Sequence, residues 1–414
     1  MEKTPAMRHF VVPAPVAARP NKRPPGGASP LKLLIMFLTR VIRLLLGTGT
    51  WLPTGYLSTA RAAHTATLLN DGTVLVTGGY NSVSKALASA EIYQPGPARW
   101  RDTSALNDAR FRHTATQLSD GRVLVAGGLN ASHQTLHSAE IYDPSTGVWT
   151  RTDGLAVARA AHTATLLANG TVLVAGGFNS DDGALASAEI YDPGTGKWHP
   201  AADMGRSHVY HSATRLLNGD VLIVNGFDDL SSVVPTAYVE LYNHATSQWQ
   251  FASRPARYSA LHTTTVLADG TVLQTGGANS GTSGLQDANR LNSETVADGE
   301  LSQSWAPTSP LVFGRLLHTA TRLSDGTVLV AGGFSDRTLP QGSSLSSSER
   351  YYPQLSTPGN FNPNGDWLGP PDLFDARGDH TATLLPDGTV LVAGGADANV
   401  PVILDSAERF YLHL

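Results

Sequence analysis

Short polar and apolar stretches recur along most of the chain in a fixed order. In one copy, HTATLL at 162–167 alternates in character, whereas TVLVAGG at 171–177 is apolar almost throughout. Alternation indicates a strand with one buried face, and a short continuous apolar run indicates a strand buried on both faces. Asn169-Gly170 lies between them and predicts a tight hairpin turn, because both residues tolerate a positive φ.

Two further stretches complete the copy. SAEIYDP at 187–193 predicts a third strand that ends at its proline, and the segment around Trp198 predicts a fourth. Trp51, Trp100, Trp149 and Trp198 are spaced by 49 residues. Four antiparallel strands in a repeat of this length are one blade of a β-propeller.

The repeat occurs seven times. Each copy has a histidine at the start of its first strand: His64, His113, His162, His211, His262, His318 and His380. A tryptophan stands 13 residues before each histidine, at Trp51, Trp100, Trp149, Trp198, Trp249, Trp305 and Trp367, and these are all seven tryptophans of the protein. The pattern predicts an all-β, seven-bladed propeller of four-stranded antiparallel blades over residues 48–414.

The ends of the repeat predict how the ring closes. The last copy has its third strand, SAERFY at 406–411, but no tryptophan segment after it. The segment around Trp51 precedes the first copy and has no blade of its own. We therefore predict that this N-terminal strand completes the last blade, which leaves no exposed sheet edge.

The Gly-Gly doublet after the second strand, the Glu-x-Tyr of the third strand and the spaced tryptophan resemble kelch repeats. The resemblance covers residues 51–414. It implies a kelch β-propeller and partner binding through the loops that enter the first strands. Because kelch propellers serve many functions, the resemblance specifies the fold more sharply than the activity.

The first 47 residues differ from the rest. Residues 1–30 are basic and rich in proline, and we expect a disordered arm. Residues 31–47 predict an apolar helix with a narrow basic stripe. Three interpretations stay open: an amphipathic helix on a membrane surface, a signal peptide or signal anchor, and the product of a misplaced start codon. We expect export or membrane association rather than a cytoplasmic location.

Composition removes several function classes. The chain has no cysteine, which excludes disulfides, thiolate catalysis and Cys-ligated zinc. Residues 1–50 hold eight Lys or Arg and one Glu, so the remainder holds 21 basic and 33 acidic residues, a balance of −12. An acidic body of this kind argues against nucleic acid as a partner.

Residues present in every blade are better candidates for structure than for catalysis. We expect the histidines to bond within each blade, and the tryptophans and tyrosines to pack between blades. The repeated glutamates and arginines predict buried ion pairs. An alternative places the arginines at the channel mouth, where they would bind an anionic ligand. These arginines are Arg61, Arg110, Arg159, Arg315 and Arg377, while Arg206 and Arg257 are shifted by two residues.

Residues that break the repeat are the next candidates for partner contact. Arg112, Tyr210 and Asp379 stand just before a motif histidine, where other blades have small or apolar residues. The loops after the Gly-Gly doublets also carry two acidic pairs. These pairs, interpreted as calcium ligands or as solvated turn residues, are Asp181, Asp182, Asp228 and Asp229.

The motifs favour binding over catalysis. There is no nucleophile elbow, phosphate loop or HExxH motif. The chain is similar in fold to galactose-oxidase-like propellers, but their copper site requires a Cys-crosslinked Tyr, which a chain without cysteine cannot form. Kelch-type sugar mutarotases act through a Glu and an Arg in the channel, and no unique pair of this kind stands out in the sequence.

We therefore expect a monomeric, non-catalytic propeller without a cofactor. Its expected partner is a protein or a glycan bound at the channel mouth, with membrane contact through residues 31–47 as a further option. Two alternatives remain: a mutarotase-like, sugar-active enzyme with its site in the channel, and a structural unit of a surface assembly.

Overall fold

The computed structural model describes residues 49–231, 234–281, 283–295, 301–336, 343–353 and 365–412. The predicted arm over 1–30 and the predicted helix over 31–47 lie outside these ranges. Within them, no helix is long and apolar enough to cross a membrane.

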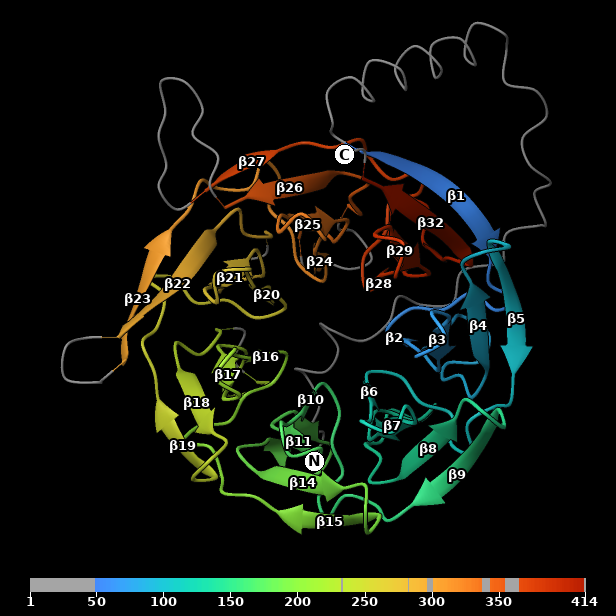
Figure 1. Cartoon of the computed structure of the whole chain (residues 1–414), viewed down its shortest axis with the longest axis horizontal. Helices are drawn as coiled ribbons and strands as arrows, with labels where there is room; N and C mark the ends of the chain where they lie inside the picture. The colour runs from blue at the N-terminus through green and yellow to red at the C-terminus, as the bar shows by residue number, and fades with distance from the viewer. Residues whose placement is uncertain are drawn as a thin grey trace, which may run out of the picture.

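Seven four-stranded antiparallel sheets are arranged around a central axis (Figure 1). The strands nearest the axis are the alternating HTATLL-type segments. They are β2 (Thr65–Leu68), β6 (Thr114–Gln117), β10 (Thr163–Leu166), β16 (Ser212–Arg215), β20 (Thr263–Val266), β24 (Thr319–Arg322) and β28 (Thr381–Leu384).

The second strand of each blade is the continuous apolar run, and all four of its residues are buried. These strands are β3 (Val74–Thr77), β7 (Val123–Ala126), β11 (Val172–Ala175), β17 (Val221–Val224), β21 (Val272–Thr275), β25 (Val328–Ala331) and β29 (Val390–Ala393). Burial on both faces follows from blades packing against each other on either side.

The third and outer strands complete the blades. The third strands are β4 (Ala90–Gln94), β8 (Ala139–Asp143), β14 (Ala188–Asp192), β18 (Val239–Asn243), β22 (Ala288–Thr295), β26 (Ser348–Tyr352) and β32 (Ser406–Tyr411). The outer strands are β5 (Arg99–Thr103), β9 (Val148–Thr152), β15 (Lys197–Pro200), β19 (Gln248–Phe251), β23 (Leu301–Pro307), β27 (Asp366–Leu368) and β1 (Thr50–Tyr56). Two short hairpins, β12 (Phe178–Asn179) with β13 (Gly183–Ala184) and β30 (Ala396–Asp397) with β31 (Val402–Ile403), lie in the loops of blades three and seven.

The ring closes as the sequence predicts. Blade seven has the strand order β1-β32-β29-β28, so the first described strand pairs with the last one. Trp51 lies opposite Phe410 in this pairing, and its indole Nε1 donates a hydrogen bond to Ser348 Oγ of blade six at 3.2 Å. The seven-bladed all-β fold closed by the strand around Trp51 is therefore confirmed.

Aromatic residues join the outer halves of the blades. Within a blade, tyrosine and tryptophan rings pack together, as Tyr142 and Trp149 do at 4.9 Å between centroids. The indole Nε1 of Trp149 then donates to the Ser104 carbonyl of the preceding blade at 2.9 Å. The apolar residues of two adjacent blades merge into one cluster in this way.

The hairpin between the first two strands differs in detail from the prediction. In blade one only Gly72, with φ of +81°, has a positive φ in the turn. The preceding Asp71 instead accepts hydrogen bonds from the backbone N–H and the hydroxyl of Thr73. Asp is favoured here for its carboxylate rather than for tolerance of a left-handed backbone.

Candidate functional site at the channel mouth

One residue of each blade lies immediately before the motif histidine, where the loop enters the innermost strand. All seven of these residues have a left-handed backbone, with φ between 49° and 61°. They are Ala63, Arg112, Ala161, Tyr210, Leu261, Leu317 and Asp379. A positive φ at non-glycine residues is costly, so seven equivalent instances indicate a constraint imposed by the ring.

The constraint is a closed circle of backbone hydrogen bonds. The N–H of each of these residues donates to the carbonyl of its equivalent in the preceding blade, over distances of 3.0 to 3.4 Å. Ala63 of blade one donates to Asp379 of blade seven, which completes the circle. Because the backbone is fixed in the same way at every position, the side chains alone determine the chemistry of the channel at this level.

Three of these side chains form one polar group. Arg112 Nη2 lies 2.9 Å from Asp379 Oδ2, and the Arg112 guanidinium carbon lies 5.1 Å from the centre of the Tyr210 ring. The small residues Ala63 and Ala161 flank Arg112 in the circle, which leaves room for its side chain to reach both partners. The ion pair is largely buried but keeps solvent access, since 12% of the Arg112 side chain and 13% of the Asp379 side chain are exposed.

The environment keeps the Arg112 side chain charged and the nearby tyrosine side chains neutral. Burial opposes the charge on Arg112, but the Asp379 carboxylate together with Tyr210 and Tyr80 outweighs burial, and the arginine pKa is raised. Burial raises the pKa of Tyr210, and it also raises the pKa of the neighbouring Tyr80. Both phenols are therefore un-ionised near neutral pH.

An apolar cluster underlies the polar group. The residue after each Gly-Gly doublet forms a β-bridge with the residue two positions before the motif histidine, as Tyr80 does with Ala62. Leu129, Phe178, Phe227 and Phe334 occupy the same position in other blades, and all are buried in one central cluster. The Arg112–Asp379–Tyr210 group is thus a small polar site against an apolar wall, the composition typical of ligand sites.

The five repeated arginines lie inside the blades. All five side chains are fully buried. In blade two, Arg110 donates to the Gly127 carbonyl at 2.7 Å and the Ser138 carbonyl at 2.9 Å, and it pairs with Glu140 at 2.9 Å. Burial lowers the pKa of Arg110 although Glu140 opposes this effect. The geometry matches the buried ion pair expected from the sequence. The alternative prediction placed Arg61, Arg110, Arg159, Arg315 and Arg377 at the channel mouth, but their side chains have no solvent exposure.

The motif histidines link neighbouring blades, so the prediction that they bond within each blade is wrong. His113 Nε2 lies 3.0 Å from the hydroxyl of Thr65 in the preceding blade. His64 of blade one makes the same contact with Thr381 of blade seven. Burial, followed by the charge of nearby arginines, lowers the pKa of His162 and of His380 to about 3.

The acidic loop pairs are exposed and form hydrogen bonds within their own loops. Asp181 and Asp182 are exposed, and their backbone N–H groups donate to the Asn179 side chain. Asp228 and Asp229 are exposed in the next blade, and Asp229 accepts hydrogen bonds from Ser231. Among the described residues, no group of three His, Asp or Glu side chains is placed to hold a metal ion.

The sequence singled out Arg112, Tyr210 and Asp379 separately, but it did not show that they meet. Arg112 and Asp379 are 267 residues apart, in blades two and seven. The available signal was their shared repeat position: three polar or aromatic side chains occupy one position that is small or apolar in the other four blades. Among these seven positions, Arg112 and Asp379 form the one arginine–carboxylate pair, which the sequence did not reveal.

The fold and this site define a seven-bladed β-propeller with a polar group in its channel mouth. Two family models match the chain: the β-propeller of tRNA wybutosine-synthesizing protein 4 over residues 58–156, and the kelch motif over residues 159–205. The chain therefore carries a kelch motif within a seven-bladed β-propeller fold. The comparison with curated proteins gives no match.

Solved structures share this fold. A fungal alcohol oxidase of the AA5 family in complex with copper superposes with a TM-score of 0.69 at 18% identity, covering 88% of this chain and 76% of that chain. The structure of YjhT superposes with a TM-score of 0.54 at 16% identity, covering 72% of this chain and 96% of that chain. At these identities the likeness shows the fold alone.

A copper site like that implied by the oxidase does not fit the described residues. Among the seven residues that precede the motif histidines, Asp379 supplies the one carboxylate, and the guanidinium of Arg112 already pairs with it. The motif histidines direct Nε2 toward neighbouring hydroxyls rather than toward one another. The donor set for a soft or borderline metal is therefore missing here.

Proposed function

We propose that this protein is a glycan-binding propeller whose channel mouth holds the ligand through Arg112, Asp379 and Tyr210. The observation that carries the proposal is the arginine–carboxylate pair, which is unique in the ring, keeps solvent access and lies beside an aromatic ring. A guanidinium donates, a carboxylate accepts and a phenol does both, so the group offers complementary partners to sugar hydroxyls. The aromatic ring adds an apolar face for a sugar ring.

The repeat itself supplies the variants for a test. Blades one and three have alanine at the position of Arg112, and blades five and six have leucine at the position of Tyr210. We expect the full chain to bind specific sugars on a broad glycan array. Arg112→Ala together with Tyr210→Leu should weaken that binding at least about tenfold, the size expected for losing a hydrogen bond to a charged group.

The matched control is Arg206→Thr, which removes an exposed arginine of blade four and copies Thr59 of blade one. Binding by the control should equal that of the wild type, and all variants should show the same thermal transition. A blank array, or binding that the channel variants do not change, would contradict a glycan site at the mouth.

A second candidate function is a sugar-active enzyme, and the same unique pair of Arg112 and Asp379 favours it. A carboxylate held beside a guanidinium can accept a proton from a bound sugar hydroxyl. Exchange between anomers, followed by NMR on a panel of reducing sugars, tests this function. Acceleration that Asp379→Asn abolishes would support an enzyme, and unchanged exchange rates would leave a binding protein.

A further inference from the structure

Blades four and five break the repeat at the buried arginine. His208 and Ser259 occupy its position, and each blade instead carries an arginine two residues earlier. In blade four, Arg206 stacks on Tyr238 at 4.8 Å. In blade five, the side chain of Arg257 is 71% exposed, and Nη1 lies 3.4 Å from the Asp287 carboxylate.

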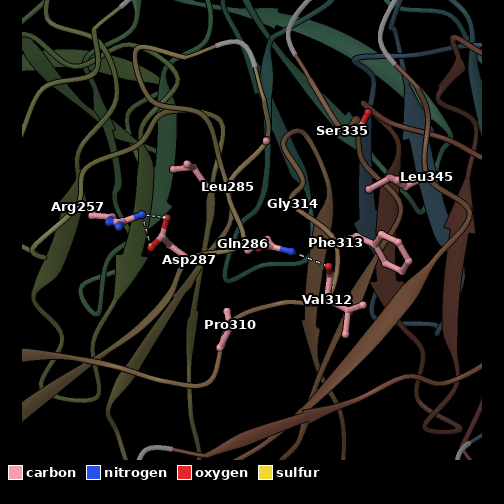
Figure 2. Close-up of a pocket in the computed structure, with 11 residues that line it drawn as sticks. Arg257, Leu285, Gln286, Asp287, Pro310, Val312, Phe313, Gly314, Ser335 and Leu345 are labelled. Atoms are coloured by element: carbon pink, nitrogen blue, oxygen red, sulfur yellow. Dashed lines mark hydrogen bonds and ion pairs between the residues drawn. The ribbon is translucent and has the colours of Figure 1, made fainter.

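Arg257 lies at the edge of a pocket between blades five and six (Figure 2). The pocket has a volume of about 590 Å³, within the usual range for ligand sites. Figure 2 shows Arg257 and Asp287 on one side, Phe313 and Val312 on the other, and Gln286 between them.

The side chains on the apolar side of the pocket are exposed to solvent. Val312 is 61% exposed and Phe313 is 49% exposed. Their backbone N–H groups donate to the buried Glu349 carboxylate at 2.6 and 3.2 Å, and Gln286 Nε2 donates to the Val312 carbonyl at 2.7 Å. The backbone is therefore fixed while both side chains remain available.

The equivalent positions in blades one and two are polar. Ser58 and Thr59 of blade one make the same backbone contacts to Glu91. In blades two and seven, the residues aligned with Phe313 are Asp108 and Asp375. The loop does not require apolar side chains in order to fold, so Val312 and Phe313 call for another explanation.

We propose that this groove binds an extended peptide segment of a partner protein, with an apolar side chain against Val312 and Phe313 and an Asp or Glu side chain on Arg257. The contact between Arg257 and Asp287 is longer than a charge-assisted hydrogen bond of about 2.7–2.9 Å, so a partner carboxylate has donors to engage. Aromatic and arginine side chains, which here line opposite sides of one pocket, are the residue types enriched in protein interface hot spots. This peptide site is separate from the channel mouth and does not depend on the proposed glycan function.

The test is selection of random 12-residue peptides on the full-length protein, followed by Kd measurement for the selected peptides by fluorescence polarisation. We expect enrichment of sequences that place an apolar residue near Asp or Glu. Arg257→Thr and Phe313→Asp, which copy Thr59 of blade one and Asp108 of blade two, should each raise Kd at least about tenfold. Arg257→Glu should bind better to a peptide whose acidic residue is replaced by lysine.

Two control variants lie outside the pocket. Arg206→Thr removes the exposed arginine of blade four, and Phe374→Ser removes an exposed aromatic residue of blade seven that aligns with Val312. Both should bind the selected peptides with unchanged Kd. Selection without enrichment, selected peptides that lack an acidic residue, or peptides whose Kd is insensitive to both pocket variants would each overturn the proposal.

Discussion

Each position of the repeat occurs seven times in this protein, and every blade gives it the same backbone conformation. Residues at one position can therefore be compared directly between blades. Ala63, Arg112 and Asp379 have φ angles of 49°, 52° and 55°, although their side chains have nothing in common. The conformation is therefore set by the circle of hydrogen bonds and not by the propensity of each residue. This separation of backbone from side chain allows the channel mouth to vary in chemistry without loss of the fold.

Blade four keeps the buried glutamate, Glu240, with His208 in place of the arginine at 3.1 Å, whereas blade five has lost both residues of the pair. Ser259 and Asn289 occupy their positions, and Gln274 replaces the valine that lies between them in most blades. Gln274 Nε2 donates to Ser259 Oγ at 3.2 Å, so an amide and a hydroxyl take over part of the ion pair's space. A buried ion pair can be replaced as a set far more easily than one partner can be removed.

This comparison predicts the effect of breaking the pair in blade three. Arg159→Ser should lower the free energy of unfolding by about 3–5 kcal/mol, because Glu189 is left buried without its cation. The triple variant Arg159→Ser, Glu189→Asn, Val174→Gln copies blade five and should recover part of that loss. Urea unfolding of each variant measures both quantities.

Arg151→Ser is the control for this series, since Arg151 forms an exposed ion pair with Asp108. Its unfolding should remain close to that of the wild type. A triple variant less stable than Arg159→Ser alone would show that the substitutions of blade five do not compensate one another.

At the scale of the blade, three kinds of contact join neighbouring blades. The motif histidine bonds to a hydroxyl of the preceding blade, and the first glycine of the Gly-Gly doublet lies against the following blade. The tryptophan Nε1 donates to a carbonyl of the preceding blade at Trp149, Trp198, Trp249, Trp305 and Trp367. A Cβ at Gly78 would lie 2.5 Å from the Arg110 carbonyl oxygen of blade two. In blade one, the first glycine thus lies too close to the next blade for a Cβ, and Gly79 lies too close to Ala62 and His64 of its own blade, whereas blade four has Asn225 at the first position.

The histidine contacts predict a strong dependence of stability on pH. Burial lowers the pKa of His162 and of His380 to about 3 and that of His262 to about 4, below the ordinary value of 6.5. Each histidine therefore takes up a proton on unfolding, and stability falls as the pH drops below about 6.5. Each of these histidines should lower the free energy of unfolding by up to about 1.4 kcal/mol for every pH unit between 6.5 and its folded-state pKa.

Unfolding by urea between pH 7 and pH 4 checks this dependence. His162→Asn should reduce the slope of unfolding free energy against pH by the contribution of one proton. An unchanged slope in this variant would mean that His162 has the same protonation in the folded and unfolded protein over this pH range.

At the scale of the whole molecule, closure of the ring is the decisive feature. Strand β1 supplies the outer strand of blade seven, and Leu57 beyond it donates its N–H to the Asp405 carbonyl at 2.7 Å. Without this strand, β32 would present an unpaired edge and the blade would lose the buried Trp51.

A chain that begins at residue 58 should therefore lose the single cooperative thermal transition. The matched control begins at residue 48 and retains β1. Scanning calorimetry compares the two, and it should find one sharp transition in the control and a broad or absent one in the shorter chain. Identical melting of both chains would mean that blade seven is stable with three strands.

Ring closure also assembles the candidate site. Blades seven, one and two are consecutive only because the two ends of the propeller meet, and Arg112 reaches Asp379 across blade one. The proposed peptide groove is also formed by two blades, the neighbouring blades five and six. Its two sides, Arg257 and Phe313, come from loops that the sequence repeat makes equivalent.

The sequence by itself determined the number of blades, the strands in each, the closing strand and the positions that break the repeat. These features depend on burial and hydrogen bonding within about 49 residues, and the sequence carries the corresponding pattern in seven copies. Only the tertiary structure decided which repeat-breaking residues meet, that the arginines lie inside the blades, and that the histidines bond between blades rather than within them. Such contacts depend on the spacing and angle between neighbouring blades, and these are properties of the closed ring that no single repeat contains.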